Sequence, residues 1–488
     1  MGFTIGALCA ILLVVFIVQV GKARELASIV RNDPAEQDEI NKFHTGLGMI
    51  FMVVFLVACV VSFVYYIPTT LGWGPNTAAS EHGPEVDYLF NLTLFFTSIV
   101  FFLTHIALFW FAWKYKGKRG QVGLYWAHNE TLEMVWMIIP SVVMTFLVVG
   151  GLQAWNNIMS DLPEDAVSVV LPEEENEFIE IEATGTQFLW LLRYSGRDGK
   201  IGTKYFTQIT TKNKLGQTWT DEKNLDDFMT NEIVLPVNKP VRVRITARDV
   251  LHNFYIRDMR VKTDAVPGMP TYFNFTPTVT TDSMRRRLSK EPSWQVPDRK
   301  DDSKMRWENF NYELACAELC GNGHYSMKNI VRIVSEEEYL DWLDKQEGGK
   351  LVETVDEATG AVTYALEKGS VKSQYLSIVH NQEGMEQTLK EKAADLEKLV
   401  ENKLIVGKYF AKLKEIRNAA EYESAEYNAA QKAMNTMKGL LQKVRLSNSV
   451  TESNATLEEA KALLANSQPV VEETTVEPMP VDSANVGG

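Results

Sequence analysis

Four side chains with soft metal-binding atoms lie within one twelve-residue segment. Cys316, Cys320, His324 and Met327 follow one another at intervals of four, four and three residues. Thiolate, imidazole and thioether donors together favour copper over magnesium, calcium or manganese. Structural zinc sites usually pair cysteines twice over and lack methionine, and iron–sulfur clusters need more thiolates than this chain has. The segment therefore predicts a copper site.

These four residues supply too few ligands for two metal ions, and His252 is the best additional donor. It lies in the stretch Asp249-Val-Leu-His252, at the end of a predicted strand and 64 residues before Cys316. A β sandwich can bring such a turn beside the cysteine segment. The Cys-x-x-x-Cys spacing alone fits a disulfide or two unrelated cysteines equally well, but His324 and Met327 in register favour a metal site.

The segment that must position these ligands has the pattern of a β domain. Apolar and polar residues alternate at 178–182, 241–245 and 272–275, as in half-buried strands. Proline and glycine punctuate these stretches, which predicts a sandwich or small barrel over residues 159–345. Residues 279–309 are rich in Arg, Lys and Asp and predict a long surface insertion, in which Arg285–Arg287 form a solvated loop.

The first third of the chain predicts four transmembrane helices. Residues 2–20, 47–67, 88–113 and 134–158 contain no Asp, Glu, Lys or Arg, and each is about the roughly 20 residues long that a helix needs to cross the hydrocarbon core. Residues 1–44 form the first span and its loop, and residues 45–158 hold the other three. The first run lacks the basic start of a signal peptide, which favours a retained helix.

The loop charges predict the orientation. Residues 21–44 and 114–133 carry four Lys or Arg each, whereas residues 68–87 carry none. The positive-inside rule places both basic loops in the cytoplasm, so everything after residue 158 lies outside. The net charge of −14 argues against a nucleic-acid-binding protein.

The C-terminal third predicts an acidic α-helical extension. Residues 351–367 have a strand–turn–strand pattern, with a turn at 357–360, and residues 384–446 show apolar residues at helical spacing, which predicts a helical hairpin within 346–446. Residues 447–488 are polar and predict a disordered tail. No Cys-x-x-Cys-His occurs, so the extension is not a haem c domain. Its expected role is to hold a partner protein.

At the predicted copper ligands and in three segments before them, the chain resembles subunit II of haem–copper cytochrome c oxidases. The family's copper motif, Cys-x-Glu-x-Cys-Gly-x-x-His-x-x-Met, is matched at every fixed position from Cys316 to Met327. The family's Val-Leu-His is matched at 250–252, the segment that follows that histidine at 262–268, and the start of its second helix at 132–140. The resemblance covers about residues 86–345.

The resemblance implies a cupredoxin-like domain with a binuclear copper centre. Both ions would be bridged by Cys316 and Cys320; His252 and Met327 would complete one, and His324 with the carbonyl of Glu318 the other. The Glu318 carboxylate would hold a magnesium or manganese shared with subunit I.

The resemblance also implies the function. The chain would accept electrons from a c-type cytochrome and pass them to the haem of subunit I, where oxygen is reduced to water with proton pumping. Its partners would be subunits I and III in a bacterial inner membrane, with the copper domain on the periplasmic side. Glu133 matches the entrance of a proton pathway, although a membrane-edge carboxylate in water would fit that position equally well.

One position departs from the family pattern. The family has Gly-His-Gln-Trp-x-Trp, whose first tryptophan receives electrons, whereas this chain has Gly185-Thr-Gln-Phe188-Leu-Trp190. Phe188 occupies the electron-entry position, which leaves Trp190 or another route for electron entry.

Other functions remain open from the motif alone. A membrane-anchored copper-delivery or thiol-redox assembly factor also uses Cys-x-x-x-Cys, but does not need Glu318, His324 and Met327 in register. Nitric-oxide and nitrous-oxide reductases share the copper motif, whereas a quinol oxidase subunit keeps the fold without the ligands. The paired helices with Glu133 favour the oxygen reductase.

Overall fold

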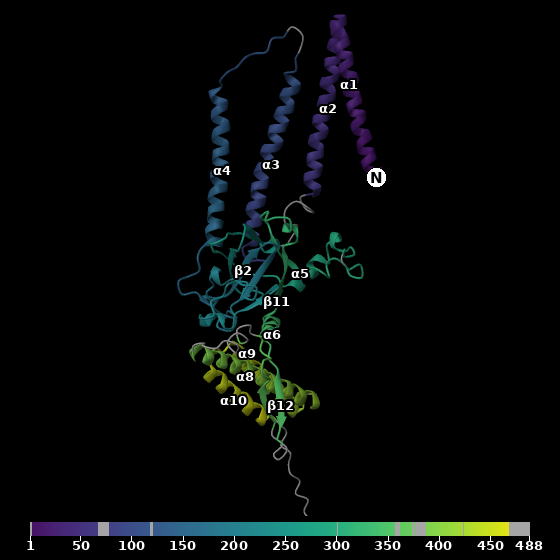
Figure 1. The fold of residues 1–488 in the computed structure, drawn as a ribbon. Helices are drawn as coiled ribbons and strands as arrows, with labels where there is room; N and C mark the ends of the chain where they lie inside the picture. The colour runs from purple at the N-terminus through teal and green to yellow at the C-terminus, as the bar shows by residue number, and fades with distance from the viewer. Residues whose placement is uncertain are drawn as a thin grey trace, which may run out of the picture. The chain divides into compact units, whose positions relative to one another are not determined.

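The computed structural model describes residues 2–66, 78–117, 121–299, 301–356, 362–372, 376, 387–422 and 424–467. The chain divides into two compact units, Met1–Ser160 and Asp161–Gly488, shown in Figure 1. The predicted turn at 357–360 and residues 468–488 of the predicted tail lie outside the described residues.

The first unit consists of long helices. They are α1 (Gly2–Arg31), α2 (Pro34–Tyr66), α3 (Gly83–Lys114) and α4 (Glu130–Met159), and each packs against the next one along the chain. Within the described part of the chain, three helices are long and apolar enough to cross a membrane: Pro34–Tyr65, Gly83–Lys114 and Glu130–Met159. The predicted first span, residues 2–20, is helical, and its crossing of a membrane stays a prediction.

Each helix extends beyond its charge-free run. The predicted loop at residues 21–44 is therefore a helical hairpin of α1 and α2, closed by a turn in which Asn32 has a φ of 51°. At the start of α4, the side chain of Asn129 accepts a hydrogen bond from the Leu132 amide, an N-cap that satisfies a free donor of the first turn.

Two β-sheets form the first part of the second unit (Figure 1). One has the strand order β4-β3-β2-β6-β9, with β1 paired to β2, and the other the order β5-β11-β10-β7-β8. The strands are β1 (Val167–Ser168), β2 (Glu177–Thr186), β3 (Leu189–Tyr194), β4 (Phe228–Thr230), β5 (Glu232–Pro236), β6 (Val241–Ala247), β7 (His252–Ile256), β8 (Val261–Ala265), β9 (Thr271–Phe275), β10 (Tyr312–Cys316) and β11 (Lys328–Val334). The three stretches predicted as strands lie within β2, β6 and β9, so these predictions are confirmed.

The core lies between the two sheets. Ile181 on β2 faces Tyr194 on β3 in register, and the Tyr194 hydroxyl bonds to the backbone of Val234 on β5, in the other sheet. The opposite face of β2 is buried too, because residues 195–227 cover it. There Arg193, which is fully buried, pairs with Glu182 and Asp227 and donates to the Gly202 carbonyl.

The predicted loop at Arg285–Arg287 is instead helical. These arginines lie in α5 (Thr281–Leu288), which buries Met284 and Leu288 and is capped by Thr280. Arg285 is also not solvated along its whole length, because it donates to the Phe310 carbonyl at 2.9 Å. Two apolar residues four apart give the helix a buried face, which the run of arginines conceals in the sequence.

The C-terminal extension packs against the β domain. The helix α6 (Glu336–Glu347), whose capping box joins Ser335 and Glu338, connects the two across the predicted boundary at 345–346. The extension contains β12 (Leu351–Val355), β13 (Val362–Leu366), α8 (Gln387–Ala419), α9 (Ala425–Leu446) and α10 (Val450–Asn466). The strand pair and the helical hairpin were predicted. The disordered tail from 447 is wrong for α10, in which Ala460 and Leu464 join the core of α8 and α9.

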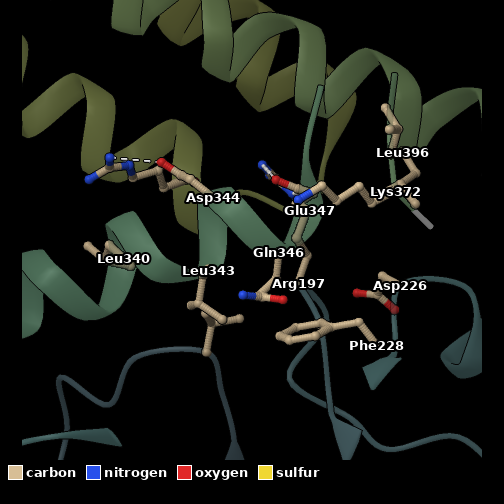
Figure 2. Close-up of a pocket in the computed structure, with 14 residues that line it drawn as sticks. Arg197, Asp226, Phe228, Leu340, Leu343, Asp344, Gln346, Glu347, Lys372 and Leu396 are labelled. Carbon is tan, nitrogen blue, oxygen red and sulfur yellow. Dashed lines mark hydrogen bonds and ion pairs between the residues drawn. The ribbon is translucent and has the colours of Figure 1, made fainter. Parts of the chain in front are cut away.

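Buried charges hold the extension in place. Arg197, in the loop after β3, forms an ion pair with Glu347 of α6, which also pairs with Lys403 of α8. Arg445 of α9 pairs with Asp344 at 2.8 Å. Figure 2 shows Arg197, Glu347 and Asp344 around a small pocket whose wall also contains Asp226 and Phe228. These contacts connect β3, α6, α8 and α9 in one unit.

Candidate metal centre

The five-stranded sheet brings the predicted ligands together at one end. His252 begins β7 and Cys316 ends β10, and these strands are antiparallel neighbours with Cys316 opposite Phe254. The loop from β10 to β11 then carries the remaining predicted ligands. Register between β7 and β10 therefore closes the 64-residue separation in the sequence.

The sulfur and imidazole atoms form one continuous cluster. Nδ1 of His252 lies 3.7 Å from Sγ of Cys316, which lies 3.8 Å from Sγ of Cys320. Cys320 Sγ in turn lies 3.6 Å from Nδ1 of His324 and 3.9 Å from Sδ of Met327. The metal-binding atoms of His252, Cys316 and Cys320 all lie within 4.8 Å of one another.

Glu318 contributes to this cluster through its backbone. Its carbonyl oxygen lies 3.2 Å from Sγ of Cys316, whereas its side chain is exposed. All six predicted positions are therefore represented at the cluster, five by side-chain atoms and one by a carbonyl.

The cluster is buried and its cysteines are free thiols. His252 and Met327 are 0% exposed, and both cysteines are buried. Burial and the neighbouring Cys316 thiol raise the pKa of Cys320 to about 11. A cation must therefore displace protons when it binds, which couples metal affinity to pH.

The donor set fits copper. Two thiols, two imidazoles and a thioether are soft ligands that select copper, and hard oxygen-preferring cations would gain little from them. The two thiols lie within 4 Å of each other, so both can contact the same ions. Among the predicted ligands of the described cluster, the Glu318 carbonyl is the one oxygen donor.

The carboxylate of Asp249 orients the predicted ligand His252. Asp249 accepts a 2.9 Å hydrogen bond from Nε2 of His252, which leaves Nδ1 facing Cys316. The same carboxylate accepts from the Thr186 hydroxyl and from the backbone amides of Gln187 and Val250. Burial alone would raise the pKa of Asp249, but these hydrogen bonds lower it to about 2.

Two further residues fit the loop closely. Gln187 donates from Nε2 to the Cys320 carbonyl at 2.6 Å. At Gly185, a Cβ atom would lie 2.8 Å from Cδ2 of His252. Sequence reasoning missed the roles of Asp249, Gln187 and Gly185; the only signal was an aspartate three residues before the histidine.

The residues at the predicted electron-entry position differ in exposure. Phe188 is 37% exposed and covers the copper-ligand loop, since a Cβ at Gly323 would lie 2.4 Å from its ring. Trp190 is only 3% exposed; its ring centroid lies 6.1 Å from that of His252. Phe188 is thus at the surface and Trp190 is next to a predicted ligand.

Glu133 has a local structural role in the first unit. One of its carboxylate oxygens accepts from the Asn129 amide at 3.3 Å and lies 4.0 Å from Nδ1 of His128. This reciprocal contact with Asn129 caps the first turn of α4. The cap is compatible with either interpretation of Glu133.

Comparisons with known proteins agree with this arrangement. A family model described as the cytochrome c oxidase subunit II transmembrane domain matches residues 68–153, and one described as its periplasmic domain matches residues 179–281. The chain belongs to the cytochrome c oxidase subunit II family. The second match includes His252 and ends near the insertion that contains α5, before the cysteine loop.

Individual relatives support the assignment. An alternative cytochrome c oxidase subunit 2 of Bradyrhizobium diazoefficiens is 28% identical over 300 residues, which are 61% of this chain and 92% of the relative. Cytochrome c oxidase subunit 2 of Cereibacter sphaeroides is 25% identical, over 58% of this chain and 82% of the relative. That of Pneumocystis carinii is 27% identical, over 57% and 96%.

The protein is accordingly subunit II of a haem–copper oxidase, and so part of a membrane-bound cytochrome c oxidase complex. The family implies a copper centre, and the His252–Cys316–Cys320 cluster is where the chain can hold it. The C-terminal extension is an addition to the subunit II architecture.

Proposed function

We propose that this subunit accepts electrons from a c-type cytochrome and delivers them to the haem of subunit I. The observation that carries the proposal is the unbroken series of contacts from His252 through Cys316 and Cys320 to His324 and Met327. A pair of copper ions held there would supply a reversible one-electron site. The oxygen chemistry and the coupled proton pumping would belong to subunit I.

The six residues have distinct tasks in this proposal. Cys316 and Cys320, at the centre of the series, would hold both ions. His252 and Met327 would add ligands to one ion, and His324 with the Glu318 carbonyl would add ligands to the other. The exposed Glu318 carboxylate would be available to a magnesium or manganese shared with subunit I.

The surrounding chain keeps these ligands in place with little freedom. Asp249 fixes the His252 ring, Gln187 ties the cysteine loop to the β2–β3 turn, and Phe188 covers the loop. Rigid ligands lower the rearrangement that accompanies electron transfer. Electrons enter across the surface at Phe188, with the buried Trp190 as a second, internal contact to His252.

The membrane part completes the proposal. Four helices, α1 to α4, cross a bacterial inner membrane with the basic segments on the cytoplasmic side and the copper domain on the periplasmic side. Subunits I and III contact this part, and Glu133 lies at a proton-pathway entrance. The C-terminal extension holds a respiratory partner complex or the donor cytochrome.

Reduction of the assembled oxidase by a reduced c-type cytochrome, followed by stopped-flow spectroscopy, tests the proposal. The complex carrying Cys316→Ser is expected to keep its haems but to lose fast electron uptake by at least a hundredfold. The exposed Glu313→Gln on β10 is the control and is expected to react at the wild-type rate. Unchanged electron uptake in Cys316→Ser would refute the proposed role.

A further inference from the structure

A second cavity lies in the membrane unit, far along the chain from the copper ligands. It has a volume of about 400 Å³ and lies between α1 and α2. Apolar side chains of α1, Phe16, Ile17 and Val20, form one part of its wall, and the polar residues Arg24, Glu39 and His44 form another. Ligand sites typically have volumes of roughly 300–1,000 Å³, so the cavity is large enough for a small organic group.

The cavity lies at the edge of the membrane. The charge-free run of α2 begins at Leu47, one turn after His44, and α2 is one of the helices able to span a bilayer. The tight turn at 32–33 makes α1 antiparallel to α2, so the apolar residues up to Val20 lie on the membrane side. Arg24 and Glu39 then lie on the water side, where phospholipid headgroups are found.

Close packing fixes the polar part of the wall. A Cβ atom at Gly21 would lie 2.8 Å from Cε1 of His44, so glycine at this position lets the imidazole pack against α1. Nε2 of His44 is shielded from solvent and has no hydrogen-bond partner among the described residues, so a molecule in the cavity does not reach it.

The two charges in the wall are also not neutralised by each other. Among the described residues of the first unit, Arg31 and Glu36 form an ion pair near the tip of the hairpin. No ion pair within 4.0 Å joins Arg24 to Glu39 in this part of the chain. A cation and an anion on opposite helices therefore face the same cavity. This pattern is complementary to a zwitterion that carries both a phosphate and an ammonium group.

We propose that this cavity binds the headgroup of an aminophospholipid such as phosphatidylethanolamine. The phosphate accepts hydrogen bonds from the guanidinium of Arg24, and the primary ammonium pairs with Glu39. The acyl chains extend along Phe16, Ile17 and Val20 towards the bilayer interior. A purely anionic headgroup would leave Glu39 unpaired, and a quaternary choline ammonium has no N–H to donate to it.

Native mass spectrometry of the delipidated oxidase complex tests this site. Phosphatidylethanolamine, phosphatidylcholine, phosphatidylglycerol and inorganic phosphate are added separately, and bound molecules are counted. The wild type is expected to retain one phosphatidylethanolamine at least tenfold more tightly than the other lipids. Arg24→Gln is expected to lose that retention, and Arg24→Lys to keep part of it.

Two more variants separate this site from general lipid adhesion. Glu39→Gln is expected to abolish the preference for phosphatidylethanolamine over phosphatidylglycerol. Lys42→Gln, on the same helix but outside the cavity wall, is expected to behave as wild type. Equal retention of all lipids by the wild type, the same loss in Lys42→Gln and Arg24→Gln, or displacement of the lipid by inorganic phosphate would overturn the proposal.

Discussion

At the residue scale, the orientation of one imidazole decides how well the centre can hold copper. His252 has two ring nitrogens, and the hydrogen bond from Nε2 to Asp249 leaves Nδ1 as the one that faces Cys316. Partners of this kind typically contribute 10–100-fold to metal affinity. A protein that lacked Asp249 would still have the same donor set.

Asp249→Asn is therefore expected to weaken copper binding about 10–100-fold without loss of the fold. The asparagine can offer an amide N–H to the ring, which destabilises the productive orientation of His252. Competition with a copper chelator measures the affinity. Glu313→Gln is the control, since Glu313 is exposed and forms an ion pair with the half-exposed Lys328; equal affinities for both variants would contradict the role of Asp249.

A second prediction concerns the close contact between Gly185 and the His252 ring. Gly185→Ala places a methyl group 2.8 Å from the His252 ring, and such overpacking costs about 1–3 kcal/mol. Both the free energy of unfolding and the copper affinity are expected to fall, as measured by denaturant titration with and without copper. Gly407→Ala on α8, where no atom lies within 4 Å of the added Cβ, should instead stabilise the protein by up to about 1 kcal/mol.

The residues that the sequence did and did not predict differ in a physical way. The ligand types at 316–327 occur at a spacing that favours a metal site, and His252 was predicted because a donor was missing. Gly185 and Gln187 act through contacts between strands that are remote in sequence, so no local pattern reveals them. The buried Glu182–Arg193 pair was likewise concealed, because strand alternation alone would place these charges in water.

At the element scale, a buried ion cluster attaches the C-terminal extension to the copper domain. Arg197 is 9% exposed and pairs with Glu347, and it also donates to the carbonyls of Val444 and Ser447. Loss of one partner of a buried pair costs about 3–5 kcal/mol, because the other charge stays buried. The extension should therefore depend on Arg197.

Arg197→Met is expected to destabilise the attachment of α8, α9 and α10 by about 3–5 kcal/mol. Faster hydrogen exchange in these helices of the full chain would report it, with β10 and β11 little affected. Lys438→Gln removes an exposed pair with Glu337 and is expected to cost no more than about 1 kcal/mol. Similar protection in wild type and Arg197→Met would show that the cluster does not hold the extension.

The same region should respond to pH in two opposite ways. Burial alone would raise the pKa of Glu347, but Arg197 and Lys403 lower it to about 2. Its contribution to stability is complete above its ordinary pKa of 4.5 and is lost as the pH falls towards about 2. Burial and the negative charge of Asp198 raise the pKa of Asp226 to about 8, so its contribution is complete below about pH 4 and is lost as the pH rises through 8.

Asp226→Asn is consequently expected to stabilise the protein increasingly as the pH rises from 4 to 8, on the order of a few kcal/mol at pH 8, and to have little effect at pH 4 or below. The amide cannot ionise, so the decline in stability between pH 4 and 8 becomes shallower. Thermal unfolding at a series of pH values measures this change. An identical pH dependence in wild type and Asp226→Asn would mean that Asp226 does not titrate in this range.

The sequence predicted some helices and strands of the C-terminal extension and missed another. Apolar residues at helical spacing gave α8 and α9, and the pattern at 351–367 gave β12 and β13. α10 was missed because its buried positions include Ser453 and Thr456, which make its sequence polar. Asn402 of α8 bonds to Ser453 and Asn454, and only the folded bundle supplies such partners.

At the scale of the whole molecule, three functions are combined in one chain. Long apolar helices hold it in a membrane, a β domain gathers soft ligands at one end of a sheet, and a helical extension is attached to that domain by buried charges. The family matches cover α3, most of α4 and the part of the β domain up to residue 281. The extension and the hairpin of α1 and α2 are the additions through which this subunit would differ in its partners and lipids.

On this proposal, Cys316 and Cys320 would together hold two copper ions. The most direct measurement is the electron paramagnetic resonance spectrum of the copper-loaded full chain, together with its copper content. The expected result is two coppers per chain and a spectrum in which one unpaired electron is shared equally by both. A single mononuclear copper signal, or the same spectrum in Cys320→Ser, would contradict the account.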